Sequence, residues 1–244
     1  MNLDSNTVLI TGGASGIGFS LAERFLLAGN TVILVGRREE KLKEAQSKYP
    51  QLHVHVSDLG KSVERTALFE WASREFPKLN VLINNAGIQQ RVQLKNAPEW
   101  KSVHEEIAVN LDAPIHLSTL FLPHFLKLEN AAILNVTSGL AFSPLANVPV
   151  YSATKAALRS FTLSLRHQLA DTSVSVIEII PPAINTDLGG KGLHTFGAPV
   201  EEFVDSVMEQ LKKGSLEATF GFSTDASRAS REQLDATFKR MNPA

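Results

Sequence analysis

A tyrosine and a lysine four residues apart, Tyr151 and Lys155, are the side chains of this sequence best suited to moving a proton. On a helix, residues i and i+4 share a face, so the phenol and the ammonium would project into one space. A nearby cation favours the phenolate and lowers the pKa of a tyrosine from its usual value of about 10. Lowering it by about three units requires about 4 kcal/mol of differential interaction and would let the tyrosine exchange a proton near neutral pH. The spacing alone is common, so its meaning depends on the elements around it.

A glycine-rich segment near the start of the chain supplies that context. A short apolar run, 7–10, precedes Gly12, Gly16 and Gly18, and a helical pattern then extends to Gly29. Strand, glycine turn and helix together are the setting of a phosphate-binding fingerprint. The glycines let the backbone turn tightly and approach a pyrophosphate, whose charge meets the amino end of the helix. Their spacing departs from G-x-G-x-x-G, and a tight turn that binds no ligand is the alternative.

The end of the second predicted strand, 31–36, bears on the choice of cofactor. An NAD site usually has an acidic residue here that binds the ribose hydroxyls, whereas this chain continues with Arg37 and Arg38. A guanidinium is planar, always charged and able to bind a 2′-phosphate through two hydrogen bonds. The sequence therefore favours NADP over NAD. Two solvated arginines at the start of a helix are the alternative.

With these features and the motifs that follow them, the chain resembles the short-chain dehydrogenase/reductase family, in its branch of single-domain oxidoreductases. The resemblance covers about residues 5–190, and its motifs occur in the family's order and spacing. The end of the chain is loosely similar to the bacterial DltE-type oxidoreductases of that family. The matching motifs are Thr11 to Gly18, Asp58-Leu59, Asn84 to Gly87, Asn110, Ser138, Tyr151 to Lys155, and Pro181 to Thr186.

The resemblance implies a catalytic centre of Ser138, Tyr151 and Lys155, with Asn110 assisting. Tyr151 would be the general acid in reduction and the general base in oxidation. Lys155 would lower the pKa of the tyrosine and hold the nicotinamide ribose, while Ser138 would hydrogen-bond the substrate oxygen as charge develops on it. Asn110 would anchor a water that carries protons to solvent. Taken apart from this pattern, Ser138 would be a turn former and Asn110 a hydrogen-bonding residue at a helix kink.

The same resemblance implies a bound nicotinamide dinucleotide. Asp58 would accept from the adenine amine, and a capping or turn role is compatible with that. Thr186 would bond the nicotinamide carboxamide. The family's usual Pro-Gly is Pro181-Pro182 here; because proline fixes φ and removes a donor, we expect a differently shaped wall beneath the nicotinamide. The implied cofactor-binding residues are Gly12, Ser15, Gly16, Ile17, Gly18, Arg37, Arg38, Asp58, Leu59, Asn85, Ala86, Gly87, Tyr151, Lys155, Pro181, Ile184 and Thr186.

The composition excludes several other classes of protein. The 244 residues are 43% hydrophobic and 20% charged, as in a globular domain. A net charge of -1 provides no basic field for nucleic acid or anionic lipid. The absence of cysteine excludes disulfides, thiolate catalysis and cysteine-bound metals, and we expect no metal site. Without a recognisable signal peptide or an apolar run of ~18 residues, the cytoplasm is the expected location.

Strand-like runs alternate with helical stretches along the chain. This alternation predicts an α/β fold: a Rossmann-type, doubly wound parallel sheet of about seven strands with helices on both faces, in a single domain over 1–244. Pro114 and Pro123 are expected to kink and then end the helical stretch 99–127. The predicted strands are 7–10, 31–36, 52–56, 79–84, 132–138, 174–180 and 218–222, and the helices after the first are 38–48, 61–76, 99–127, 151–170 and 230–241.

Two segments lie outside this alternation. The glycine-rich stretch 186–199 corresponds to a mobile lid over the substrate in the family, with a flexible loop as the alternative. The segment 223–244 is predicted to be a C-terminal extension whose last helix begins with a capping box of Ser230 and Gln233. That helix could close the pocket, join a subunit contact or decorate the surface.

The function favoured by these features is that of an NADP(H)-dependent carbonyl reductase or alcohol dehydrogenase. A non-catalytic NADP(H)-binding sensor and an epimerase that uses the same Tyr-Lys pair are the alternatives. Family members commonly pair through the helical stretches 99–127 and 151–170, so a homodimer or homotetramer is expected. A small uncharged ketone, aldehyde or alcohol is the expected substrate, because the candidate pocket residues are apolar: Leu140, Phe142, Leu145, Val148, Ile184, Leu188 and Phe196.

Overall fold

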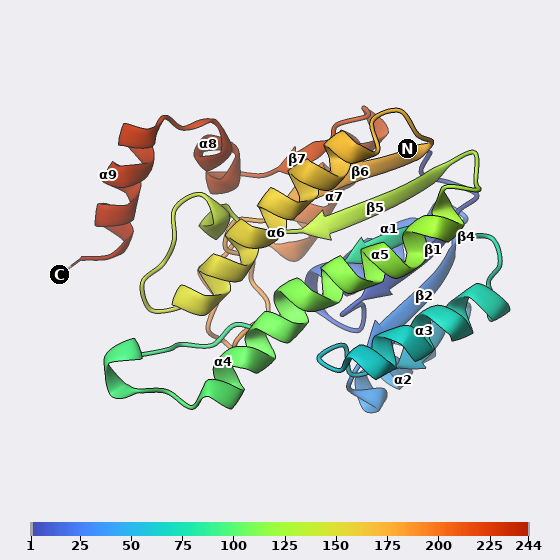
Figure 1. Ribbon diagram of the computed structural model, residues 1–244, viewed down its shortest axis with the longest axis horizontal. Coiled ribbons are helices and arrows are strands. Elements are labelled where there is room, and N and C mark those ends of the chain that lie inside the picture. The colour runs from blue at the N-terminus through green and yellow to red at the C-terminus, as the bar shows by residue number, and fades with distance from the viewer. Residues whose placement is uncertain (1, 244) are drawn as a thin grey trace.

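The computed structural model describes residues 2–243, which form a seven-stranded parallel sheet in the order β3-β2-β1-β4-β5-β6-β7 (Figure 1). This is the doubly wound Rossmann-type sheet expected from the alternation of strands and helices, and the predicted fold class is confirmed. The strands are β1 (Thr7–Thr11), β2 (Thr31–Gly36), β3 (His53–Val56), β4 (Leu79–Asn84), β5 (Ala131–Val136), β6 (Val174–Ile180) and β7 (Glu217–Thr219).

Helices cover both faces of the sheet. Helices α1, α2 and α7 pack on one face, and α3, α5 and α6 pack on the other. Figure 1 shows α5 and α6 crossing in front of the strands, α4 at the lower left beyond the strand ends, and α9 standing away from the sheet at the left. The helices are α1 (Gly16–Leu27), α2 (Glu39–Lys48), α3 (Ser62–Glu75), α4 (Trp100–Ile107), α5 (Ala113–Phe125), α6 (Pro149–Gln168), α7 (Val200–Lys212), α8 (Phe222–Arg228) and α9 (Arg231–Met241).

The apolar strands are explained by burial on both faces. Successive side chains of a strand point to opposite faces, so Val8 and Ile10 of β1 enter the core beneath α1 and α7, while Leu9 enters the core beneath α3 and α5. All three are fully buried. A parallel sheet covered on both faces therefore reads as a continuous apolar run rather than an alternating one.

The strand order changes direction between β1 and β4, where an open α/β sheet is expected to have a binding crevice. The chain leaves β1 toward β2 on one side, and it reaches β5 and β6 only after β4 has paired on the other side of β1. In an open α/β sheet, ligands bind beyond the carboxyl ends of the strands at such a switch of direction. The turn after β1 and the segment 85–87 after β4 both lie at this switch point.

The helical stretch 99–127 departs from its prediction in two respects. A π-helical turn, Ala108–Asp112, separates α4 from α5. Pro114 has no N–H to donate to the carbonyl of Asn110, and the helix widens at these residues. Pro123 does not end the helix as expected: α5 continues to Phe125, because the amides that follow the proline still find carbonyls one turn earlier.

The C-terminal region also differs from its prediction. The expected strand 218–222 is shorter, since β7 ends at Thr219 and α8 begins at Phe222. The sequence pattern did not indicate α8, a seven-residue helix that packs behind the turn following β5. Ser230 and Gln233 form the capping box that was expected at the start of α9. Within residues 2–243, every helix is too short or too polar to cross a bilayer.

Candidate active site

Tyr151 and Lys155 lie in the first turns of α6, which begins at Pro149, a residue suited to the first position of a helix. Both are almost completely buried. The Lys155 ammonium lies 5.6 Å from the centre of the Tyr151 ring, and it donates a hydrogen bond to the carbonyl oxygen of Val136 at 2.7 Å. Val136 ends β5, so the hydrogen bond ties the lysine to the carboxyl edge of the sheet. The expected sharing of one helix face by the two side chains is confirmed.

Ser138 follows β5 and reaches the same place. Its hydroxyl accepts a hydrogen bond from the amide of Leu140 at 3.1 Å and caps a single 3₁₀ turn, Gly139–Ala141. Phe222 of α8 packs behind that turn, because a Cβ added to Gly139 would lie 3.1 Å from its ring. The serine hydroxyl lies close enough to the Tyr151 phenol to lower the pKa of the tyrosine.

Burial opposes the expected acidity of Tyr151. It is the main cause that raises the pKa of Tyr151 to about 12; the Ser138 hydroxyl opposes this shift, and the charge of Glu106 adds to it. Burial also lowers the pKa of Lys155 to about 8, since the ammonium is itself removed from water. Burial thus moves the pKa of Tyr151 in the direction opposite to the one expected from its cationic neighbour, because desolvation penalises the charged phenolate.

Asn110 lies in the π-helical turn and is completely buried. Its side-chain oxygen accepts from the amide of Ile88 and its nitrogen donates to the carbonyl of Ile88, both at 2.8 Å. A third contact joins that nitrogen to the hydroxyl of Thr154 at 3.3 Å. A Cβ added to Gly87 would lie 3.5 Å from the Asn110 oxygen and 3.7 Å from the Lys155 nitrogen. Asn110 thus lies next to Lys155 and holds the segment after β4.

The glycine turn lies directly against the end of β4. Gly12 and Gly16 have φ values of +63° and +54°, a region that favours glycine. Asn85 donates to the carbonyls of Thr11 and Gly12 at 2.9 and 3.2 Å, which locks the turn to the end of β4. Gly18 lies so close to Gly12 and Asn85 that a side chain there would overlap both.

The amino end of α1 fits an anion such as a pyrophosphate. Ser15 occupies the capping position without a side-chain cap, and the first turn contains no acidic residue. The first amides of a helix have no partner within it, and their dipoles attract negative charge. Gly16 and Ile17 open this turn, and Thr186 lies against it, 3.2 Å from the position of a Cβ on Gly16. The residues of the turn therefore leave these donors available to a ligand.

Arg37 and Arg38 follow β2 and both are exposed. Arg37 forms an ion pair of 2.9 Å with Glu105 of α4. Arg38 reaches back toward the hydroxyl of Ser15, at 3.5 Å, and so extends over the glycine turn. Arg38 therefore lies nearer the turn, while Arg37 has an acidic partner that the sequence did not indicate.

The remaining cofactor candidates occupy the edges of the crevice. Asp58 forms a turn by accepting from the amide of Gly60 at 3.1 Å, the role that was expected to be compatible with ligand contact. Leu59 belongs to the core under α3, and Ala86 is half-buried against that core. Asn84 is a sheet residue: it donates to Asn135 at 2.9 Å, in register with it on β5.

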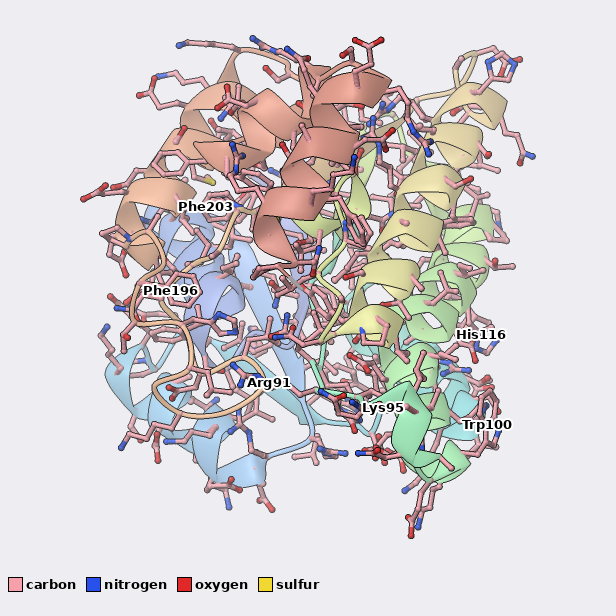
Figure 2. All side chains as sticks on the ribbon, turned by 90° about the vertical axis from the view of Figure 1, so that its left-hand side faces the viewer. Arg91, Lys95, Trp100, His116, Phe196 and Phe203 are labelled. Carbon is pink, nitrogen blue, oxygen red and sulfur yellow. The ribbon has the colours of Figure 1, made fainter. Side chains whose placement is uncertain are left out.

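The residues after β6 close the crevice from the other side. Pro181 accepts from the amide of Gly139 at 2.9 Å and so joins the ends of β5 and β6. Ile184 is buried in the core under α1 and α7 and pairs with Ala198 in a short bridge that brings the two ends of the segment 186–199 together. In Figure 2, which looks onto the edge where the strands end, Phe196 lies on this segment and is well exposed.

Two buried carboxyl groups near the site were not indicated by the sequence reading. Glu106 lies four residues before Asn110, and this spacing could have suggested a shared helix face. Glu178 interrupts the apolar strand β6, binds the hydroxyl of Thr137 at 2.7 Å and pairs with Arg159. Among residues 2–243, no group of three or more His, Cys, Asp or Glu side chains could hold a metal ion.

These features define a nucleotide-binding α/β oxidoreductase: a doubly wound sheet, a glycine turn at a helix amino end, and a buried Tyr-Lys pair beside it. The family model described as short chain dehydrogenase matches residues 6–195. The chain belongs to the short-chain dehydrogenase family.

Individual relatives agree with this assignment. An oxidoreductase of Bacillus subtilis (strain 168), named DltE and described as uncharacterized, is 49% identical over 99% of this chain and 98% of its own length. A short-chain dehydrogenase of Burkholderia cenocepacia J2315 in complex with NADP is 27% identical, with a TM-score of 0.84 over 98% of this chain and 99% of that one. A short-chain dehydrogenase of Sphingobium yanoikuyae in complex with NADPH is 26% identical, with a TM-score of 0.82 over 98% of both chains.

Proposed function

We propose that this protein is an NADP(H)-dependent oxidoreductase that interconverts a small ketone or aldehyde and the corresponding alcohol. One observation carries the proposal: Ser138, Tyr151 and Lys155 meet at the carboxyl edge of the sheet, across the crevice from a glycine turn with an open helix amino end. A structural cluster would not require a buried phenol and a buried amine to lie together beside an anion-binding turn.

Tyr151 is the proton donor in the direction of reduction. Because burial keeps its pKa well above neutral, the phenol is protonated and can donate to the carbonyl oxygen of the substrate. Ser138, whose hydroxyl lies close to the phenol, binds the same oxygen as negative charge develops on it. Lys155 lies beside the ring, and its positive charge stabilises the phenolate that remains after proton transfer. In oxidation the same groups act in the reverse order.

The residues around the crevice fit a nicotinamide dinucleotide. The open amides of Gly16 and Ile17 suit the pyrophosphate, and the close approach of Gly12, Gly18 and Asn85 leaves the turn without side chains that would cover it. When bound, the nicotinamide supplies the hydride that is exchanged with the substrate carbon. The other proposed contacts are those of Ser15, Asp58, Leu59, Ala86, Gly87, Pro181, Ile184 and Thr186 at the edges of the crevice.

The preference for NADP rests on Arg37 and Arg38. No acidic side chain follows β2, and Arg38 extends over the turn toward Ser15, where a phosphate on the adenosine ribose would meet two guanidinium groups. Arg37 must exchange Glu105 for that phosphate. The exposed ion pair is worth at most about 1 kcal/mol, less than a charge-assisted bond to phosphate. The NADP and NADPH named for the two structural relatives support this choice.

The substrate side of the site supports an uncharged molecule. Val148 and Ile184 are buried, and Leu140 and Leu188 are half-buried. We propose that the segment 186–199 is a lid over this region. We also propose that copies of the chain pair through α4, α5 and α6, the helices of the stretches 99–127 and 151–170. An apolar groove between α4 and α6 supports this, lined by Leu94, Ile107, Leu111, Pro149, Val150, Ala153, Thr154 and Ala157.

The test is oxidation of NADPH and of NADH by the purified protein with a panel of uncharged aldehydes and ketones. We expect turnover with at least one carbonyl and a preference for NADPH. Tyr151→Phe, which removes only the hydroxyl, should bind NADPH with unchanged affinity and lose at least 100-fold in kcat/KM. Tight NADPH binding without turnover across the panel would refute catalysis and favour a sensor. Equal use of the two cofactors would refute the proposed role of the arginines.

A further inference from the structure

Glu106 is a carboxyl group beside the active site to which the proposed chemistry gives no role. It lies in α4 and is completely buried. One of its oxygens accepts from the amide of Gln90 at 3.2 Å, while the other is buried without any hydrogen-bond partner. Burial raises the pKa of Glu106 to about 7, and the Gln90 amide lowers it, so the carboxyl changes its charge near neutral pH. A buried carboxyl is costly, and its presence requires an explanation.

Glu106 and Asn110 hold the same segment of chain from one helix face. Asn110 binds both backbone groups of Ile88, and Glu106 binds the amide of Gln90. The two side chains are four residues apart on the helix, and the backbone groups that they hold are two residues apart. In an extended segment, backbone groups two residues apart point to the same side. The hydrogen bonds of the two side chains therefore hold residues 88–90 against the helix.

Gln89, which lies between the two residues held by these hydrogen bonds, contacts the proposed lid. The side-chain oxygen of Gln89 lies 3.1 Å from the ring nitrogen Nε2 of His194. The Gln89 carbonyl lies 3.1 Å from the position of a Cβ on Gly189, so the backbone of the lid also rests on this residue. The segment 88–90 is therefore held by α4 on one side and supports the lid on the other.

Within residues 2–243, Glu106 forms no ion pair. Helix α6, which contains Tyr151 and Lys155, packs against α4, and the charge of Glu106 raises the pKa of the Tyr151 phenol. Arg91 and Lys95 lie on the loop beside α4, near the edge of the sheet shown in Figure 2. Within residues 2–243, none of these cations forms an ion pair with Glu106. Its single hydrogen bond to Gln90 is thus its main stabilising contact.

We propose that Glu106 is a positioning residue of this active site, which with Asn110 clamps residues 88–90 to α4 and thereby holds the lid through Gln89. The clamp is weaker with the ionised carboxylate than with the protonated acid, because burial penalises the charged form more than the Gln90 amide stabilises it. The effect of the clamp on substrate binding rests on the proposed oxidoreductase function. The existence of the clamp does not depend on that function.

Hydrogen exchange of the intact protein at pH 6 and pH 8 tests the clamp. After correction for intrinsic rates, we expect the Gln90 amide to be protected about fivefold less at pH 8 than at pH 6 in the wild type, because opening of the clamp returns the ionised carboxylate to water. Glu106→Gln keeps an oxygen acceptor and cannot ionise, so its protection should not change between the two pH values. Glu129→Gln, which removes an exposed carboxyl elsewhere, should behave like the wild type. The variant retains His194, so any contribution of this residue cancels in the comparison.

Glu106→Leu removes the acceptor altogether and should expose both the segment 86–92 and the lid residues 189–197 to faster exchange. If this variant does not fold, the Glu106→Gln comparison decides alone. Equal exchange of wild type and Glu106→Gln at both pH values would overturn the proposal. An exchange difference in a protein that reduces no carbonyl would uphold the clamp and reject the proposed function, so the two failures are distinguishable.

Discussion

The ammonium of Lys155 lies 5.6 Å from the ring centre of Tyr151 and at the same time donates to the carbonyl oxygen of Val136 at 2.7 Å. The lysine is thus anchored to the end of β5 rather than bonded to the phenol. Its effect on the tyrosine is electrostatic and depends on the lysine remaining charged. Because burial lowers the pKa of Lys155 to about 8, that charge is lost just above neutral pH.

The first prediction follows from this loss of charge. Carbonyl reduction by the wild type should decline as pH rises through about 8, because the deprotonated lysine no longer stabilises the phenolate. Lys155→Met should lose at least 100-fold in kcat/KM at pH 7, and its residual activity should show no decline near pH 8. The pH profile of kcat/KM is the measurement. Lys127→Met, at an exposed position, is the control, and a Lys155→Met profile that still falls near pH 8 would assign the decline to another group.

The second prediction concerns the ion pair between Arg37 and Glu105. Arg37→Ala should weaken NADPH binding roughly 10- to 100-fold and leave NADH binding nearly unchanged, because only NADPH carries the 2′-phosphate. Glu105→Gln should strengthen NADPH binding by up to about fivefold, since the guanidinium no longer has a competing carboxylate. Fluorescence titration with each cofactor measures both effects. Arg74→Ala, which breaks another exposed ion pair, is the matched control; weaker NADPH binding by Glu105→Gln would contradict the competition.

The third prediction separates two reasons for a glycine. Gly18 has no positive φ, but a Cβ there would overlap the side chain of Asn85 and the backbone of Gly12. Gly214 has a φ of +78°, with open space around its Cβ position. Gly18→Ala should therefore displace the turn and weaken NADPH binding more than 10-fold, at a cost of about 1–3 kcal/mol in stability. Gly214→Ala should cost about 1 kcal/mol and leave NADPH binding intact. Equal losses of affinity in the two variants would exclude a specific role for the turn.

The fourth prediction is the pH dependence of stability that Glu106 causes. Its folded-state pKa of about 7 exceeds the ordinary value of 4.5, so the folded protein binds more protons than the unfolded chain between these values. The free energy of unfolding therefore decreases as pH rises from 4.5 to 7, by about 3 kcal/mol from this group alone. Glu106→Gln should lack that decrease. Urea unfolding of the wild type and the variant at pH 5 and pH 8 measures the difference, and parallel curves would show that Glu106 does not titrate as described.

The fold was predictable because local patterns and the core agree. Val8, Leu9 and Ile10 form an apolar run that only a sheet covered on both faces can bury completely. The departures occur where backbone hydrogen bonding overrides the pattern. Pro123 was expected to end a helix, yet the amides after it still find carbonyls. Phe222 was expected to continue a strand, yet it begins a helix that packs against the turn after Ser138.

The residues of the candidate site could be predicted from the sequence, but their pKa values could not. Tyr151 and Lys155 share a helix face because residues four apart must do so. Their acidities depend on how much water the folded chain removes from each group, and no spacing in the sequence encodes that quantity. The ion pair of Arg37 could not be predicted either, because Glu105 lies on a helix remote in sequence and only folding brings the two residues together.

The sequence by itself determined the doubly wound sheet, the glycine turn and the spacing of the Tyr-Lys pair, because short-range geometry and apolar periodicity are written residue by residue. Tertiary structure alone decided the burial that sets the charges of Tyr151, Lys155 and Glu106, and the meeting of α4 with the segment 88–90. These depend on which surfaces exclude water and which distant backbone groups become neighbours, and both are properties of the packed chain rather than of any stretch of it.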